Sequence, residues 1–261
     1  NNMKNFILYT FFVVLLSACS YYAKILKGSD YSQKFVTANA LYDQKEFDKA
    51  IVLYEQIYQH APKSGEGELS YYRMAQAYYE IEDFYMAQYY YSSYMQRFPY
   101  SDKSEEILFM IAMCSVKNSP EHTLDQTETE LAISNVQQFV DRYPSSYLVD
   151  SCNLIIDQLR FKLERKEFET VQLYDRTENY KAAVAAGELF MEHYSRSAFM
   201  EEAHYIVVKN SYFMTINSIE SKKSERSAQT TERFRNFAIR YAGSKYLKEL
   251  EGYMALLEKK Q

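Results

Sequence analysis

Residues 35–62 read FVTANALYDQKEFDKAIVLYEQIYQHAP, and the same pattern returns at residues 72–99 as YRMAQAYYEIEDFYMAQYYYSSYMQRFP. Ala50 recurs as Ala87 and Pro62 as Pro99, so 37 positions separate both pairs. A period of this length is typical of helix pairs that stack, because each pair can bury its apolar face only against a neighbour. The repeat therefore predicts an all-α solenoid.

The spacing within each copy identifies the kind of repeat. The second copy carries the tetratricopeptide pattern of aromatic, bulky, small and terminal proline residues at Tyr71, Met74, Ala75, Tyr78, Ala87, Tyr91 and Pro99. The first copy keeps the pattern at Ala38, Leu41, Ala50, Tyr54 and Pro62. It departs at Lys34, which occupies the place of the opening aromatic residue.

Three weaker copies follow these two. The third places helices around Ile107 and Ala132, and the polar stretch Lys117–Thr129 is expected to be a loop between them. Further helices are expected over Tyr147–Leu159 and Phe161–Asp175, the second of which leads into a fourth copy around Ala183. The first, second and third copies together predict three repeats over 31–144.

The last copy and the chain end complete the expected fold. A fifth pair is expected around Ala203 and Phe237, with the charged stretch Ser218–Ser227 as the loop between its helices. Residues Lys245–Lys260 are amphipathic, as the capping helix of a repeat array should be. The sequence thus predicts five tetratricopeptide helix pairs and a C-terminal cap, with the C-terminal part spanning 145–261.

The start of the chain has the features of an export signal. Lys4 precedes the apolar run Phe6–Leu16, which is too short to span a bilayer because about 20 residues are needed. The run ends in Leu16-Ser17-Ala18-Cys19, which resembles the lipobox of bacterial lipoproteins. This predicts a signal peptide over 1–18, acylation of Cys19 and a lipidated tether over 19–30. The alternative is an ordinary signal peptide with a chance cysteine.

By analogy with bacterial sorting rules, the residues after Cys19 favour one membrane. Ser20 is not the aspartate that retains lipoproteins at the inner membrane, and residues 21–24 lack the acidic run of surface-exported lipoproteins. The predicted location is the periplasmic face of the outer membrane. Of the other cysteines, Cys114 and Cys152 lie on apolar helical stretches and are expected to be buried thiols, with a disulfide as the alternative.

Composition and motifs argue against two classes of function. The formal net charge is −5 and the sequence has no basic tract, so no nucleic-acid partner is expected. The four histidines do not form a metal motif, and His60 and His193 are expected at the surface near helix ends. No GxSxG, phosphate loop or EF-hand series is present. The sequence predicts no catalytic residue, metal or cofactor.

A binding surface is the expected functional feature. Tetratricopeptide geometry places the inner groove on the first helices of the pairs, at Phe35, Asn39, Tyr42, Tyr72, Gln76 and Tyr79. Asn39 matches a carboxylate-binding position of related repeats, but Phe35 replaces their lysine. Such a groove suits an apolar or aromatic peptide, because tyrosine offers a large contact area and a hydroxyl. The alternative is that these tyrosines only join neighbouring repeats.

The order of these features resembles the BamD family, lipoproteins of the β-barrel assembly machinery. The resemblance rests on the lipobox and on residues 35–38, 77–99, 166–183 and 221–226. It implies a non-enzymatic protein that binds a POTRA domain of a BamA-like barrel protein and receives unfolded outer-membrane precursors at its N-terminal groove.

The partner contact is expected at Lys222, Lys223 and Arg226, against the alternative of a solvated charged loop. Two other function classes remain open. One is a periplasmic tetratricopeptide adaptor for another envelope complex. The other is a SusD-type glycan-capturing lipoprotein, which the lack of tryptophan and the short chain disfavour.

Overall fold

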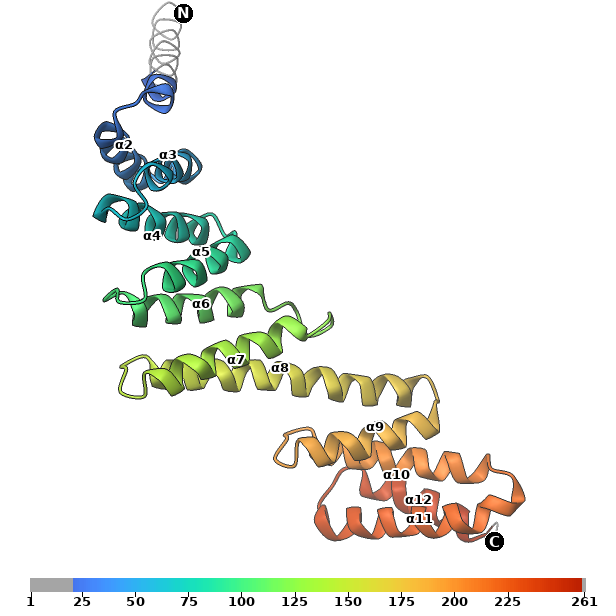
Figure 1. Cartoon of the computed structure of the whole chain (residues 1–261). Helices are drawn as coiled ribbons and strands as arrows, with labels where there is room; N and C mark the ends of the chain where they lie inside the picture. The colour runs from blue at the N-terminus through green and yellow to red at the C-terminus, as the bar shows by residue number, and fades with distance from the viewer. Residues whose placement is uncertain (1–20, 260–261) are drawn as a thin grey trace, which may run out of the picture. The chain divides into compact units, whose positions relative to one another are not determined.

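The computed structural model describes residues 21–259, which are helices and connecting turns without a β-strand. The labelled helices within these residues are α2 (Tyr31–Asp43), α3 (Phe47–His60), α4 (Gly65–Glu80), α5 (Phe84–Arg97), α6 (Ser104–Asn118), α7 (Thr127–Arg142), α8 (Val149–Arg176), α9 (Tyr180–His193), α10 (Met200–Ile216), α11 (Glu220–Arg240) and α12 (Leu247–Glu258) (Figure 1). The predicted all-α class is confirmed, and α12 occupies the place of the expected C-terminal cap.

The described residues form two compact units. Unit 1 comprises residues 21–120 and 126–156, and unit 2 comprises residues 121–125 and 157–259. The division falls after Ile156, inside α8, whereas the sequence placed it after Pro144. The reason is how α8 is buried: Cys152 and Ile156 pack with Phe139 of α7, while Phe168 packs with Phe190 of α9.

In unit 1 each helix packs on the next, from α2 through α7. Ala38, Ala50, Ala75 and Ala87, the small residues of the first two copies, are fully buried. A methyl group is all that fits where two helix backbones approach closely, which explains why these positions recur. Larger side chains fill the remaining space, among them Tyr54, Ile57, Met74, Tyr91 and Tyr94.

The turn inside the helix pair is also repeated. Lys45, Glu82 and Glu178 have φ of 62°, 63° and 55°, the left-handed region that ends helices. The N–H of the following residue bonds back to the carbonyl five residues earlier, as from Asp83 to Tyr78 (2.9 Å). These three turns share one geometry without a glycine, so no residue type in the sequence marks them.

Two predicted element boundaries are wrong. The helices expected over Tyr147–Leu159 and Phe161–Asp175 are one helix, α8, because no glycine or proline interrupts the residues between them. The loop expected over Ser218–Ser227 is mostly the start of α11, which begins at Glu220. The glutamates, lysines and arginine of this stretch favour a helix. The stretch was predicted as a loop because it is polar throughout. The connection between α6 and α7 lies within the predicted loop Lys117–Thr129.

Candidate functional site

The predicted groove residues of unit 1 lie on α2 and α4, the first helices of the first two pairs. On α2, the Asn39 side-chain oxygen accepts a hydrogen bond from the Tyr54 hydroxyl at 2.8 Å. Phe35 is half-buried against the core. The Tyr42 ring meets Phe47 edge-on, with 5.2 Å between ring centroids. These contacts hold the three side chains in fixed positions on α2.

Tyr72 differs from the other predicted groove residues because its ring is buried, with 6% exposed. Its hydroxyl donates to the Glu106 carboxylate on α6 and accepts from the Gln76 side-chain amide at 2.9 Å. Burial, followed by the hydrogen bond to Glu106, raises the pKa of the Tyr72 phenol well above its usual range. Tyr72 therefore links the second helix pair to the third. Its hydrogen-bond partners Gln76 and Glu106 are accessible to solvent, whereas the Tyr72 ring is not.

Arg73 connects Tyr42 of α2 to Gln76 of α4, and Tyr79 lies three residues beyond Gln76 on the same helix. The Arg73 guanidinium lies 4.7 Å from the centroid of the Tyr42 ring and donates to the Gln76 side-chain oxygen at 3.2 Å. The buried Nε of Arg73 has no hydrogen-bond partner among the described residues. We define the aromatic–amide row as Tyr42, Arg73, Gln76, Tyr79 and Glu106, with Tyr72 beneath it.

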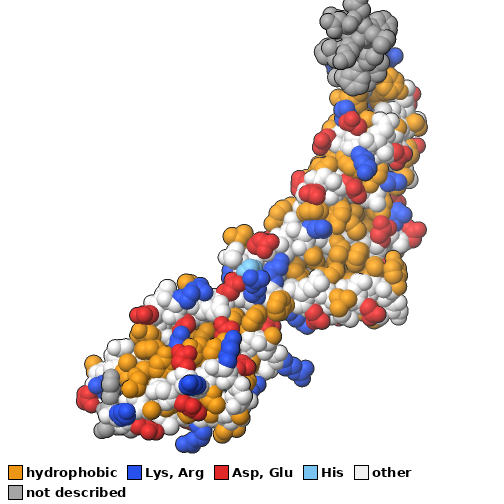
Figure 2. Space-filling model, turned by 180° about the vertical axis from the view of Figure 1, so that it is seen from behind, with side chains coloured by type: hydrophobic (Ala, Val, Ile, Leu, Met, Phe, Trp, Pro, Cys, Tyr) orange, Lys and Arg blue, Asp and Glu red, His pale blue; other side chains and the backbone are white. Residues whose placement is uncertain are grey.

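Sequence reasoning missed Arg73 and Glu106. Arg73 directly follows a predicted groove residue, and Glu106 lies in the first turn of α6, where an acidic residue is common, so each signal was weak. The row combines aromatic faces with guanidinium, amide and carboxylate groups. This set can pair with the backbone of an extended peptide and hold an apolar side chain. Figure 2 shows hydrophobic side chains gathered on the face of unit 1 turned away from the viewer of Figure 1.

The predicted partner residues of unit 2 occupy the first two turns of α11, not a loop. Lys223 pairs with Glu220 at 2.9 Å on the surface, and the Arg226 guanidinium donates to the Ser218 hydroxyl. The Lys222 side chain is exposed. A helix fixes the spacing of these cations, so they form one rigid charged surface rather than a mobile segment.

A cavity opens beside this surface, between the end of α10, α11 and α12. Its volume is about 830 Å³, and Glu220 and Lys223 lie on its wall, as do the small residues Ser224 and Ser227 and the apolar residue Leu257. A second cavity of about 560 Å³ shares Thr231, Arg235 and Leu257 with the first and is also lined by Phe234, Ala238, Ile239, Met254 and Glu258. We call the two together the cap cavity.

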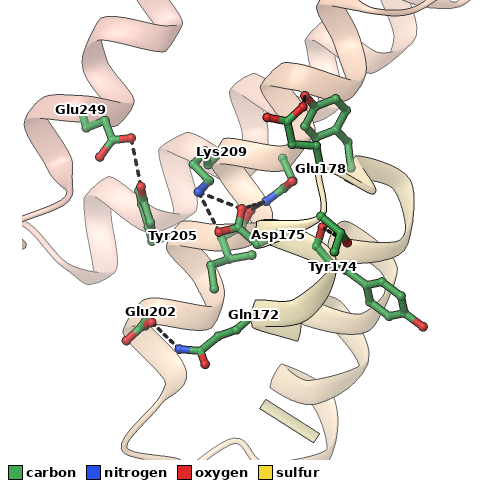
Figure 3. Close-up of polar contacts among 12 residues, drawn as sticks. Gln172, Tyr174, Asp175, Glu178, Glu202, Tyr205, Lys209 and Glu249 are labelled. Carbon is green, nitrogen blue, oxygen red and sulfur yellow. Dashed lines mark hydrogen bonds and ion pairs between the residues drawn. The ribbon is translucent and has the colours of Figure 1, made fainter. Parts of the chain in front are cut away.

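Polar contacts inside unit 2 tie its helices together (Figure 3). The Asp175 carboxylate on α8 accepts from Lys209 at 2.8 Å and from the Asn210 amide at 2.6 Å, both on α10. The Tyr205 hydroxyl of α10 donates to Glu249 of α12 at 3.0 Å. Asp175, Lys209 and Glu249 thus each have a hydrogen-bond partner on a neighbouring helix.

The two histidines at helix ends and the two described cysteines have structural environments. His60 ends α3 and stacks on Tyr31, with 3.7 Å between ring centroids, and His193 ends α9 beside Glu167. Cys114 and Cys152 are buried free thiols, and burial raises the pKa of Cys114 to about 12.

Within residues 21–259 no three potential metal ligands come together. In that same range, no helix has the length and apolar character needed to cross a membrane. The predicted lipidation site, Cys19, lies outside the described residues.

Comparison with known proteins identifies the family. No curated protein matches the chain. A family model described as an outer membrane lipoprotein, YfiO, matches residues 28–224. The match covers most of the chain. It includes all of unit 1 from Gly28 onwards and unit 2 as far as Ser224, so it contains Lys222 and Lys223 but not Arg226. The chain therefore belongs to the YfiO family of outer membrane lipoproteins.

Proposed function

We propose that this chain is a non-enzymatic subunit of the β-barrel assembly machinery, anchored through acylated Cys19 to the periplasmic face of the outer membrane. Unit 1 binds unfolded outer-membrane precursors, and unit 2 binds the POTRA region of a BamA-like barrel protein. The observation that carries the proposal is the family match across both helical units. The aromatic–amide row supports it, since its groups suit a peptide and not a reaction.

The row supports peptide binding through two kinds of group. Tyr42 and Tyr79 are partly exposed rings held by Phe47 and Phe84, so little conformational entropy is lost on contact. Arg73 and Gln76 supply hydrogen-bond donors and acceptors beside them. A precursor ending in an aromatic residue matches this chemistry, because the ring can pack on tyrosine while its backbone bonds to the polar groups.

Peptide binding is tested with Tyr42→Ala and Tyr79→Ala. Each should weaken binding of an aromatic-ended barrel peptide by about 1–3 kcal/mol, measured by calorimetry. Tyr72 is not the variant of choice, since its truncation would leave a core cavity. Tyr85→Ala and Tyr89→Ala are matched controls, because these α5 rings are 61% and 59% exposed. Equal effects in both pairs, or none in a folded protein, would remove the groove assignment.

The barrel partner is tested by affinity purification of the acylated protein from envelope membranes. A POTRA-containing barrel protein should be recovered. Recovery of murein or division proteins without a barrel protein would favour the periplasmic adaptor instead. Mass spectrometry of Cys19 tests the anchor separately, and an unmodified mature cysteine would contradict it.

A further inference from the structure

Residues 21–27, which begin two positions after Cys19, are packed against the first repeat. Residues 21–27 are helical, and Ile25 is 5% exposed within the core of unit 1. Tyr22 and Leu26 pack against the same core, and the Tyr22 hydroxyl donates to the Lys49 carbonyl at 3.3 Å. We call residues 21–27 the docked segment. It occupies most of the stretch that the sequence predicted as a tether.

Lys34, the residue that breaks the repeat pattern, holds this segment in place. Its side chain is 4% exposed, and its ammonium donates to the Leu26 carbonyl at 3.1 Å and to the Gln56 side-chain oxygen at 2.6 Å. The ammonium also lies 5.0 Å from the centroid of the Tyr31 ring. Leu26 is in the last turn of the segment, where carbonyl groups have no helical partner and a cation is favourable. Lys34 thus caps the docked segment from inside the repeat.

The outer face of the docked segment is cationic and aromatic. Tyr21, Lys24 and Lys27 are exposed, with 53% of Tyr21 accessible. Their spacing of three residues puts them on one side of the helix, with Tyr21 at the edge of that side next to Ile25. Residues 21–29 contain no acidic residue. Among the described residues, no carboxylate forms an ion pair with Lys24 or Lys27.

Chain length limits how far this face can be from the membrane. Only Ser20 separates Cys19 from Tyr21. Two residues span at most about 7 Å even when fully extended. The polar headgroup layer on each side of a bilayer is about 5–8 Å thick. If Cys19 carries acyl chains, the start of the docked segment must therefore lie at the headgroups.

We propose that Tyr21, Lys24 and Lys27 form a docking surface for anionic phospholipid headgroups. The proposal rests on the proposed anchor at Cys19. Lysines attract phosphate, and tyrosine is favoured at the interface, where one side is apolar and the other wet. Because Lys34 fixes the segment to the first repeat, this contact holds unit 1 itself at the membrane surface.

The test separates the surface from the anchor by using the full mature chain with Cys19→Ser. Binding is measured by sedimentation with vesicles of phosphatidylglycerol and phosphatidylcholine, at low ionic strength. We expect the chain to bind these vesicles and to bind pure phosphatidylcholine much less. Each lysine near an anionic surface changes the partition constant about fivefold, so Lys24→Gln with Lys27→Gln should lower it about 25-fold. Raising the salt to 0.5 M should have the same effect, because counter-ions screen the lysines.

The matched control is Lys63→Gln with Lys117→Gln, which removes the same charge from exposed sites elsewhere on unit 1. It should leave the partition constant nearly unchanged. Equal losses in both double variants, equal binding to both kinds of vesicle, or no binding at all would overturn the proposal. The anchor fails on a different result, an unacylated Cys19 in cells, so the two failures can be told apart.

Discussion

At the scale of single residues, Lys34 shows how an exception to a repeat pattern can carry information. A lysine at an aromatic position reads as a weak match in the sequence. In the structure its ammonium is buried and has three neighbours, the Leu26 carbonyl, the Gln56 amide oxygen and the Tyr31 ring. The sequence could not predict this, because both hydrogen-bond acceptors come from other helices.

Removing the Lys34 ammonium should destabilise unit 1. Lys34→Ala leaves two inward-facing oxygen atoms without their charged donor, which should lower the free energy of unfolding by about 2 kcal/mol. Urea denaturation checks the total effect. Hydrogen exchange checks its place, because the Gly28 amide bonds to the Lys24 and Ile25 carbonyls and should exchange faster. Lys63→Ala is the control, and an unchanged Gly28 amide in the Lys34 variant would contradict the capping role.

Gly187 is a second residue whose identity is fixed by packing. A Cβ atom there would lie 2.4 Å from Val207 Cγ2 and 3.5 Å from Val171 Cγ1. Both valines are buried and cannot move aside. Gly187→Ala should therefore lower stability by about 1–3 kcal/mol, although alanine favours a helix. Gly252→Ala has open space around it and should raise stability by up to about 1 kcal/mol, so thermal unfolding should move in opposite directions for the two variants.

At the scale of elements, the sequence predicted the helices that bear the repeat pattern and failed where the pattern stops. The fully buried alanines 38, 50, 75 and 87 are positions that the pattern itself marks. The continuous helix α8 and the start of α11 are not marked, because uninterrupted helix formers look alike whether they end one repeat or begin another. Of the row on α2, α4 and α6, the sequence marked Tyr42, Gln76 and Tyr79, whereas Tyr72, which it also marked, lies beneath the row.

The contact between α10 and α11 should depend on pH through His204. Its ring lies edge-on to Phe237 and Tyr241, at 5.6 Å and 5.9 Å between centroids, and its Nδ1 is buried without a partner among the described residues. Burial, with a smaller effect of nearby Arg240, lowers the pKa of His204. The unfolded chain therefore binds the proton more readily, since a free histidine titrates near about 6.5.

It follows that the stability contributed by His204 is present above pH 6.5 and is lost as the pH falls through its lower folded pKa. Urea midpoints measured between pH 7 and pH 5 should fall more steeply for the wild type than for His204→Phe. Identical slopes for wild type and His204→Phe would show that the ring is not a titrating part of this contact.

At the scale of the whole molecule, the repeat count was predictable and the division into units was not. The boundary lies inside α8, where Ile156 is buried with the helices of unit 1 and Phe168 with those of unit 2. The sequence of a continuous helix does not indicate which neighbouring helices its two halves pack against. As a result, the aromatic–amide row lies wholly in unit 1, and the cap cavity, with Lys223 on its wall, lies wholly in unit 2.

Placing the two surfaces in different units predicts that their functions can be separated. Tyr42→Ala with Tyr79→Ala should weaken peptide binding and leave capture of the barrel protein intact. Lys222→Glu with Lys223→Glu should weaken capture of the barrel protein and leave peptide binding intact. The reversed charges would repel an acidic surface on the barrel protein and slow its association with unit 2. The control for charge is Arg176→Glu with Lys181→Glu, exposed cations elsewhere in unit 2. Calorimetry measures peptide binding, and co-purification measures capture of the barrel protein. If either double variant lost both activities, the peptide and the barrel protein would share one site. The assignment of one partner to each unit would then be wrong.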